Sequence, residues 1–255
     1  MGEGARSGLR YVLANWKMYL AGAQAAELLQ TAQAGLDERF PAGRELPTLI
    51  VCPPFTSLAP LSALVDRRLV RLGAQNCHWE DAGPHTGEVS PRMLAELVDY
   101  VMIGHSERRA AGESDDQIAR KVAAAAEAGL TPILFVGEDE PASGATDETE
   151  RRLERGLSEV DLERRQVLVG YEPTWAIGGD RPADSGHVRG VVEQLRDRLG
   201  ELGARQPEII YGVTVNADNV EQFTEIDVLD GVGATRGSLE AAERLRIVER
   251  VARAD

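Results

Sequence analysis

Short runs of apolar residues recur along the whole chain, and each run is bounded by Gly, Pro or Asn. The runs are rich in Val, Ile and Leu, and their apolar character is continuous rather than alternating. Continuous apolarity is typical of strands that are buried on both faces, as in a parallel sheet. The runs predict eight strands, at residues 11–14, 48–52, 70–74, 100–103, 132–136, 167–170, 209–212 and 228–231.

Amphipathic stretches that favour helix formation lie between the predicted strands. Residues 21–40 place three leucines at helical spacing, and residues 115–129 begin with acidic residues and end at a glycine. Acidic residues at the start and glycine at the end are the polarity expected of helix caps. Three more stretches have the same character, at residues 146–160, 185–202 and 238–252.

Strands and helices therefore alternate along the chain, with no linker or low-complexity segment that would mark a domain boundary. Eight strand–helix units in about 250 residues match the size of a (β/α)8 barrel. We predict an α/β fold, a (β/α)8 TIM barrel in which residues 1–255 form a single domain. An open doubly wound sheet is the alternative, but no G-x-G-x-x-G turn follows the first predicted strand.

Composition narrows the classes of function. The chain is 43% hydrophobic and 27% charged, and its formal net charge of −14 argues against nucleic acid as a partner. Its apolar runs are far shorter than the ~20 residues of a membrane-spanning helix, and we expect no membrane partner. With no apolar segment of signal-peptide type near the start and only two cysteines, Cys52 and Cys77, we expect a cytoplasmic protein.

Polar and titratable residues directly follow several of the predicted strands. In a (β/α)8 barrel these positions meet at one face, where active sites lie. The sequence therefore predicts one site that combines an amide, an ammonium, an imidazole and carboxylates. The residues are Asn15 and Lys17 after the first strand, His105 and Glu107 after the fourth, and Glu172 after the sixth.

This combination is suited to moving a proton beside a carbonyl group. A carboxylate shielded from water, such as Glu172, has a raised pKa and can take a proton from a carbon next to a carbonyl. A neutral imidazole at His105, beside helix N-terminal amides, can donate a hydrogen bond to the carbonyl oxygen. Residues 175–178, called the lid below, read Trp-Ala-Ile-Gly and are too apolar for a solvated loop, which indicates a segment that excludes water.

The same residues also have structural interpretations: a surface lysine at Lys17, a core histidine at His105 and an ordinary strand-end carboxylate at Glu172. No Ser-His-Asp arrangement, Walker loop or Cys/His cluster offers a competing chemistry. We predict that the site uses neither a metal nor a cofactor.

Three motifs occur in the order and spacing of one family. They are Asn-Trp-Lys-Met from Asn15, Gly-His-Ser-Glu-Arg-Arg around His105, and Tyr-Glu-Pro-Thr-Trp-Ala-Ile-Gly around Glu172. Over nearly its whole length the chain resembles the triosephosphate isomerase family. The resemblance implies an aldose–ketose isomerase that acts on a small phosphorylated sugar through an enediolate.

The resemblance also implies a role for each candidate residue. Glu172 would be the base and His105 the electrophile. Lys17 and Asn15 would stabilise the enediolate, and Glu107 would be a buried carboxylate near the site.

Phosphate binding and assembly follow from the same resemblance. Gly178 would present its backbone amide to the phosphate group, and Thr214 would keep a hydroxyl and an amide for it after the seventh strand. The chain would form a homodimer in which the loop from Asn76 to Thr86 docks beside the partner's active site.

Two loops depart from the family pattern. After the seventh strand Val213 replaces a glycine, and after the eighth strand the family's paired glycines are Thr235 and Arg236. The guanidinium group of Arg236 can bind phosphate in their place. Gly233 stands where the family has a leucine and would leave room for an extra hydroxymethyl group. Triose phosphates are the expected substrates, a four-carbon erythrulose phosphate is the alternative, and a catalytically inactive barrel that binds a phosphorylated ligand is a third.

Overall fold

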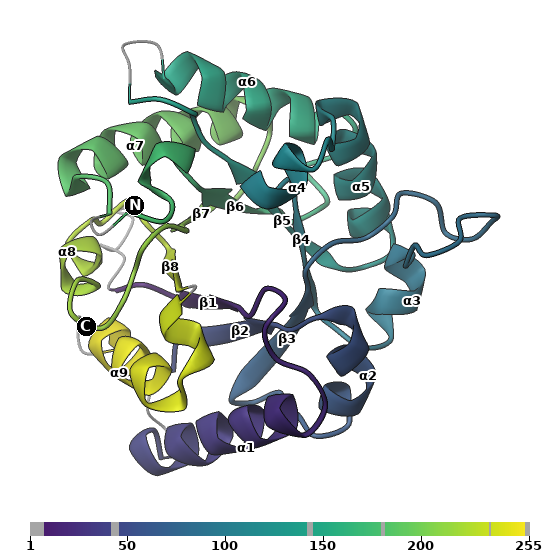
Figure 1. The fold of residues 1–255 in the computed structure, drawn as a ribbon. Coiled ribbons are helices and arrows are strands. Elements are labelled where there is room, and N and C mark those ends of the chain that lie inside the picture. Colours follow the sequence, from purple (N-terminus) through teal and green to yellow (C-terminus); the bar gives the residue numbers. More distant parts are fainter. Residues whose placement is uncertain (1–7, 42–45, 142–144, 180–181, 235, 253–255) are drawn as a thin grey trace.

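Eight parallel strands form a closed barrel in the computed structural model, which describes residues 8–41, 46–141, 145–179, 182–234 and 236–252. Each strand is hydrogen-bonded to the next along the chain, and the last pairs with the first (Figure 1). The predicted fold class is confirmed. The strands are β1 (Tyr11–Asn15), β2 (Thr48–Cys52), β3 (Val70–Ala74), β4 (Tyr100–Ile103), β5 (Thr131–Val136), β6 (Leu168–Tyr171), β7 (Glu208–Tyr211) and β8 (Gly231–Ala234).

Helices surround the barrel and cover the outer face of the strands (Figure 1). None of the helices in the described ranges is long and apolar enough to cross a membrane. The helices are α1 (Gly22–Arg39), α2 (Phe55–Ser62), α3 (Pro91–Ala95), α4 (Ser106–Ala110), α5 (Asp115–Glu127), α6 (Ala145–Leu157), α7 (Ser185–Glu201), α8 (Glu221–Thr224) and α9 (Ala241–Ala252), with short 3-10 helices η1 (Thr174–Ala176) and η2 (Arg236–Leu239).

The strands bury side chains on both faces, which explains their continuous apolar character. Side chains on the outer face join those of the surrounding helices in one large apolar cluster. Side chains on the inner face fill the barrel itself. This inner cluster consists of Tyr11, Leu13, Ile50, Cys52, Met102, Ile133, Phe135, Leu168 and Ile210.

The eighth strand lies three residues later than residues 228–231, so this prediction is wrong. The apolar residues before Asp230 only lead into the strand, and the carbonyl oxygen of Asp230 accepts a hydrogen bond from the backbone N–H of Tyr11 (3.1 Å). Glycines within β8 lower its strand propensity, so the sequence pattern does not identify it as a strand. A Cβ at Gly231 would lie 2.6 Å from the Cβ of Tyr11, so the packing of β8 on β1 requires glycine there.

The other differences are smaller. β6 and β7 are each displaced by one residue from their predicted ranges. The predicted final helix at residues 238–252 is interrupted, because η2 ends at Leu239 and α9 begins at Ala241. Helices α2, α3, α4 and α8 are too short for hydrophobic periodicity to predict.

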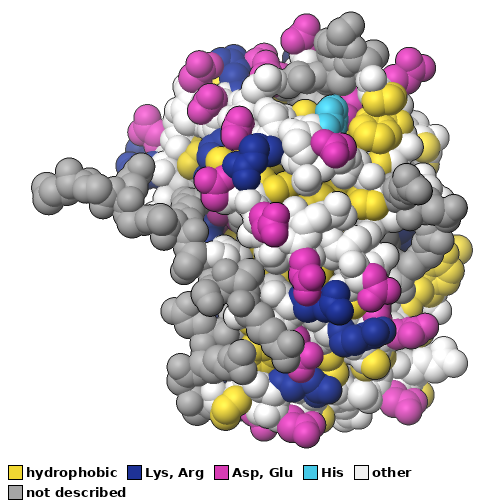
Figure 2. All heavy atoms as spheres, turned by 90° about the vertical axis from the view of Figure 1, so that its left-hand side faces the viewer, with side chains coloured by type: hydrophobic (Ala, Val, Ile, Leu, Met, Phe, Trp, Pro, Cys, Tyr) yellow, Lys and Arg dark blue, Asp and Glu magenta, His cyan; other side chains and the backbone are white. Residues whose placement is uncertain are grey.

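Acidic side chains lie among lysine and arginine side chains on the face drawn in Figure 2. Arginines on α6 and α7 form ion pairs with carboxylates of other elements, as Arg155 does with Asp116 and Arg198 with Glu154. Charge is therefore balanced locally at these pairs, although the whole chain carries a net charge of −14.

Candidate active site

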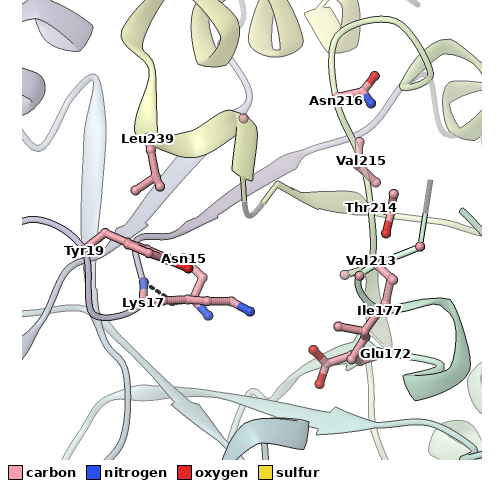
Figure 3. Close-up of a pocket in the computed structure, with 14 residues that line it drawn as sticks. Asn15, Lys17, Tyr19, Glu172, Ile177, Val213, Thr214, Val215, Asn216 and Leu239 are labelled. Atoms are coloured by element: carbon pink, nitrogen blue, oxygen red, sulfur yellow. Dashed lines mark hydrogen bonds between the residues drawn. The ribbon is translucent and has the colours of Figure 1, made fainter. Parts of the chain in front are cut away.

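A cavity of about 550 Å³ lies at the end of the barrel where the strands finish (Figure 3). Its walls come from the ends of β1 and β6, from the lid and from the segments after β7 and β8. Lys17 and Glu172 point into the cavity from opposite sides. The residues that line it are Asn15, Lys17, Tyr19, Glu172, Ile177, Gly178, Gly179, Gly212, Val213, Thr214, Val215, Asn216, Gly237 and Leu239.

Asn15 and Lys17 form one wall of the cavity. Lys17 has a left-handed backbone conformation (φ 47°), which is uncommon for any residue other than glycine. Two hydrogen bonds hold this conformation: the backbone N–H of Lys17 donates to Oδ1 of Asn15 (2.9 Å), and Nε2 of Gln75 donates to the carbonyl oxygen of Lys17 (2.8 Å). The first bond also orients the amide of Asn15, so that Nδ2 lies 3.5 Å from Nε2 of His105.

His105 follows β4 and is buried, with its ring edge against Phe135. Nδ1 of His105 accepts a hydrogen bond from the backbone N–H of Glu107 (3.2 Å). Because an accepting nitrogen uses its lone pair, the geometry assigns the proton of the neutral ring to Nε2. Nε2 in turn lies 3.1 Å from Oε1 of Glu172. The ring therefore directs a proton donor toward the interior of the site.

Glu172 follows β6 directly and is also buried. Its backbone N–H donates to the carbonyl oxygen of Val136 (2.7 Å), and its Oε2 accepts a hydrogen bond from the backbone N–H of Ser106 (2.9 Å). A Cβ at Gly137 would lie 2.1 Å from the carbonyl oxygen of Glu172, so only glycine fits beside it. Segments after β4 and β5 thus fix both the main chain and the carboxylate of Glu172.

Glu107 is not the buried carboxylate that the family resemblance implies, and this expectation is wrong. Its side chain is 56% exposed, and Oε1 lies 2.6 Å from Nζ of Lys17. The reason is local: none of the residues of α4 is buried, because this single turn projects from the end of β4 toward solvent. Glu107 therefore pairs with Lys17 at the edge of the cavity.

The lid begins three residues after Glu172 and borders the cavity. Ile177 and Gly178 line it, and Gly178 has a positive φ of 75°. Thr214, after β7, also lines the cavity, and its Oγ1 donates a hydrogen bond to the carbonyl oxygen of Ala176 (3.0 Å). Thr214 has a left-handed backbone conformation (φ 53°), which is strained for a β-branched residue. The segment after β7 is thus tied to the lid.

The predicted phosphate loop after β8 is described only in part. Thr235 lies outside the described residues, as does the side chain of Arg236, whose backbone opens η2. Gly237 and Leu239 of the same turn line the cavity, and the sequence analysis did not assign them to the site. Their position in a turn directly after a barrel strand was the signal that could have identified them.

A much smaller space of about 10 Å³ lies inside the barrel next to His105, Phe135 and Gly233. This is about the room that one water molecule needs. A Cβ at Gly233 would lie only 3.1 Å from Cα of Gly212, so main chain occupies that side of Gly233. The space beside Gly233 does not favour a larger, four-carbon substrate.

Glu138 is a buried carboxylate that the sequence analysis missed. It is fully buried after β5, and its Oε1 accepts hydrogen bonds from Nε1 of Trp175 (2.9 Å) and from the hydroxyl of Tyr171 (2.9 Å). Nε2 of His187 lies 3.1 Å from the same oxygen. Burial raises the pKa of Glu138, but these hydrogen bonds outweigh burial and leave the pKa below its usual value. The signal was its position: it follows a barrel strand, after a glycine.

The loop from Asn76 to Thr86 connects β3 to α3, and its residues from position 80 onward are exposed. The ring of His78 stacks on Trp79 (4.1 Å between centroids) and contacts that of His85 (4.3 Å). These ring contacts give the loop a defined shape. Within the described ranges, no group of three or more His, Cys, Asp or Glu side chains is arranged to hold a metal ion.

Known proteins share both the sequence pattern and the fold. The family model described as triosephosphate isomerase matches residues 10–251. A triosephosphate isomerase of Synechococcus sp. (strain JA-2-3B'a(2-13)) is 39% identical over 242 residues, which are 93% of this chain and 95% of that protein. The triosephosphate isomerase of Aquifex aeolicus (strain VF5) is 36% identical over 247 residues, 94% of this chain and 98% of that protein.

Among solved structures, the triosephosphate isomerase from Bartonella henselae superposes with a TM-score of 0.80 at 30% sequence identity. The match covers 94% of this chain and 98% of that one. The range matched by the family model includes all eight strands of the barrel. The chain belongs to the triosephosphate isomerase family.

Proposed function

We propose that this protein interconverts D-glyceraldehyde 3-phosphate and dihydroxyacetone phosphate. The observation that carries the proposal is that Glu172, Asn15 and Lys17 line one cavity at the strand ends, with His105 buried next to Glu172 and Asn15. A buried carboxylate in contact with an imidazole, with an ammonium group opposite, suits proton transfer beside a carbonyl. The relatives' shared name supports the same reaction.

In the proposed reaction the carboxylate of Glu172 takes a proton from the carbon next to the substrate carbonyl. The electron pair of the broken C–H bond forms the C=C bond of an enediolate, and negative charge develops on the former carbonyl oxygen. The proton of the hydroxyl group on the first carbon passes to this oxygen by way of Nε2 of His105, and the proton on Glu172 then returns to the neighbouring carbon, which completes the isomerisation. No proton is gained or lost overall, so one carboxylate serves as base and then as acid.

The other residues stabilise the charge on the oxygen. Nε2–H of His105 donates a hydrogen bond to it, since the backbone of Glu107 occupies Nδ1. The ammonium group of Lys17 supplies the positive charge that an acidic protein needs locally to hold an anion. The oriented amide of Asn15 adds a second donor. These groups are fixed before substrate arrives, which is how electrostatic stabilisation lowers a barrier.

The phosphate group is assigned to the part of the cavity lined by Gly178, Thr214 and Gly237. Backbone amides at Gly178 and Gly237, with the amide of Thr214, are the donors we propose. Thr235 and Arg236 complete this predicted set, with the guanidinium group of Arg236 as a direct phosphate ligand.

Replacement of Glu172 by Gln tests the proposal, because the amide keeps the shape of the carboxylate and loses its basicity. We expect kcat for D-glyceraldehyde 3-phosphate to fall by a factor of about 10²–10⁴, measured by coupled oxidation of NADH. The control is Glu193→Gln, since Glu193 lies on the exposed side of α7 away from the cavity. If Glu172→Gln retains full activity, or the native protein turns over neither triose phosphate, the proposal fails.

We also propose a cytoplasmic homodimer. The exposed part of the loop from Asn76 to Thr86 is the proposed contact, and Met18 and Tyr19 beside the active-site lysine add exposed apolar surface (93% and 69% exposed). Sedimentation equilibrium would give the mass, and Met18→Glu together with Tyr19→Glu should shift a dimer toward monomer. The two buried free cysteines support a reducing compartment.

A further inference from the structure

Two consecutive carboxylates after β5 hold two consecutive residues after the proposed base. Oε1 of Glu138 accepts a hydrogen bond from Nε1 of Trp175 (2.9 Å), and Oδ1 of Asp139 accepts one from Oγ1 of Thr174 (3.0 Å). The backbone N–H of Thr174 also donates to the carbonyl oxygen of Glu138 (3.0 Å). Oγ1 of Thr174 donates to the carbonyl oxygen of Glu138 as well (3.2 Å). Four hydrogen bonds therefore attach Thr174 and the first lid residue, Trp175, to the segment after β5.

Asp139 is itself held in place by Arg152 of α6. Nη2 of Arg152 lies 2.7 Å from Oδ2 of Asp139, and Nη1 lies 3.3 Å from Oδ1, a two-point contact that fixes the plane of the carboxylate. Arg152 is 17% exposed and is anchored in turn by the carbonyl oxygen of Gly137 (2.5 Å) and by Glu148 (2.6 Å). The hydrogen bond from Arg152 is the main reason why the pKa of Asp139 lies below its usual value.

Trp175 and Ala176 of the lid pack against the apolar core, whereas open space lies on both sides of Ile177. A second cavity, of about 680 Å³, lies on the other side of the lid, and its walls include Asp139, Arg152 and Thr174. Ile177 lines both this cavity and the candidate active site. Because open space flanks Ile177 on both sides, the hydrogen bonds at Thr174 and Trp175 contribute to the position of the lid.

We propose that Asp139, oriented by Arg152, is a positioning residue that fixes the main chain at Thr174 and thereby the carboxylate of Glu172. This inference rests on the proposed role of Glu172 as the base. Only Pro173 separates Thr174 from Glu172, and the φ angle of proline is fixed by its ring. A displacement at Thr174 is therefore transmitted to Glu172 with little loss.

The chemistry of the contact explains the residue types. A carboxylate only accepts hydrogen bonds, so its partner has to donate, and the hydroxyl of Thr174 can do so. Valine has the same shape as threonine and no donor, whereas serine keeps the donor. Neither Thr174 nor Asp139 lines the candidate active site, so their replacement should change the placement of the base and not the binding of substrate.

The experiment measures kcat and KM for Thr174→Val, Thr174→Ser, Asp139→Ala and the double variant Thr174→Val/Asp139→Ala. We expect Thr174→Val and Asp139→Ala each to lower kcat about fivefold to tenfold, the range for one hydrogen bond to a charged group that water can reach. KM should stay within about a factor of two. Thr174→Ser should keep at least about half of the native kcat.

The double variant separates this role from a general loss of structure. If both residues act through one contact, the double variant should be no slower than the slower single variant. The matched control is Thr224→Val, because Thr224 also donates its hydroxyl to a backbone carbonyl (that of Glu221, 2.8 Å) but lies on α8, remote from the lid. It should leave kcat unchanged, and thermal unfolding of every variant would show that each one folds.

The results distinguish a failure of the positioning role from a failure of the proposed function. An active native protein in which Thr174→Val and Asp139→Ala leave kcat unchanged, lower it additively, or raise only KM would overturn the positioning role and leave the proposed function intact. A loss in Thr174→Ser as large as that in Thr174→Val would also overturn it. If the native protein lacks isomerase activity, or Glu172→Gln retains it, both proposals fall. Asp139→Ala, at a side chain 59% exposed, decides the question if Thr174→Val does not fold.

Discussion

Nε2 of His105 lies 3.1 Å from Oε1 of Glu172, and the two side chains are only 7% and 6% exposed. In the absence of a substrate, His105, the proposed hydrogen-bond donor, therefore has Glu172, the proposed base, as its partner. Oε2 of Glu172 has its own partner in the backbone of Ser106. A buried site without unpaired polar groups can be rigid before substrate binds, and a carbonyl oxygen that arrives between the two residues replaces one hydrogen bond by another.

The first prediction concerns His105. Because Nδ1 accepts a hydrogen bond from the backbone N–H of Glu107, ¹⁵N NMR should show that the neutral ring carries its proton on Nε2. His105→Gln should lower kcat by a factor of about 10²–10⁴ with little change in KM. A ring with its proton on Nδ1 would contradict the assignment.

The second prediction concerns Gly137. Alanine there would bring Cβ to 2.1 Å from the carbonyl oxygen of Glu172. Main-chain atoms cannot move away without disturbing the strands to which they are bonded. We expect Gly137→Ala to lower the free energy of unfolding by more than about 2 kcal/mol and to abolish most of the activity. Gly190→Ala is the control: it lies within α7, nothing lies within 4 Å of the added Cβ, and the change should stabilise by about 0.5–1 kcal/mol. Urea unfolding measures both, and equal effects would disprove the steric explanation.

The third prediction concerns the strained backbone of Thr214. Thr214→Gly relieves about 1 kcal/mol of left-handed strain but loses a hydrogen bond of similar size to Ala176. Its free energy of unfolding should stay close to the native value. Thr214→Val keeps the strain and loses the bond, so it should be destabilised by about 1 kcal/mol. A glycine variant less stable than the valine variant would show that the conformation is not strained.

The fourth prediction is a pH dependence at Glu138. Its folded-state pKa lies below the usual value, so its ionised form stabilises the fold above the unfolded-state pKa. That contribution should be lost as the pH falls through the folded-state pKa, below about pH 4. Glu138→Gln should flatten this part of the stability curve, and the change should be visible in the fluorescence of Trp175, which donates to Glu138. A native curve that is flat from about pH 4.5 downward would contradict it.

The fifth prediction concerns the thiols. Burial raises the pKa of Cys77 to about 12 and that of Cys52 further still. Both should therefore be protonated and unreactive toward a thiol reagent at pH 8 in the folded protein. Both should react after denaturation, which serves as the control, and rapid labelling of the native protein would show that the loop after β3 opens.

The sequence is sufficient to predict the candidate site residues that directly follow a strand. Asn15, Lys17, His105 and Glu172 could be assigned because continuous apolar runs located the strand ends, and a barrel brings such ends together. The exposure of Glu107 could not be predicted, because it depends on the direction in which α4 leaves the barrel.

Other features depend on contacts between distant segments. The sequence predicts β8 three residues too early because the strand contains glycines. Gly231 is required by close contact with the side chain of Tyr11, which lies more than 200 residues away in sequence. The link between Thr174 and Asp139 joins two loops in the same way. Periodicity within one segment carries no information about such partners.

The pairing of β1 with β8 also governs how the molecule is made. Asn15 is synthesised long before Glu172, yet the ring is complete only when Ala234 pairs with Ala14. Until then β1 and the most recently formed strand each present unpaired backbone groups to the cell. A chain that stops before β8 would therefore expose two strand edges, and it would lack the segment after β8 that forms part of the wall of the cavity.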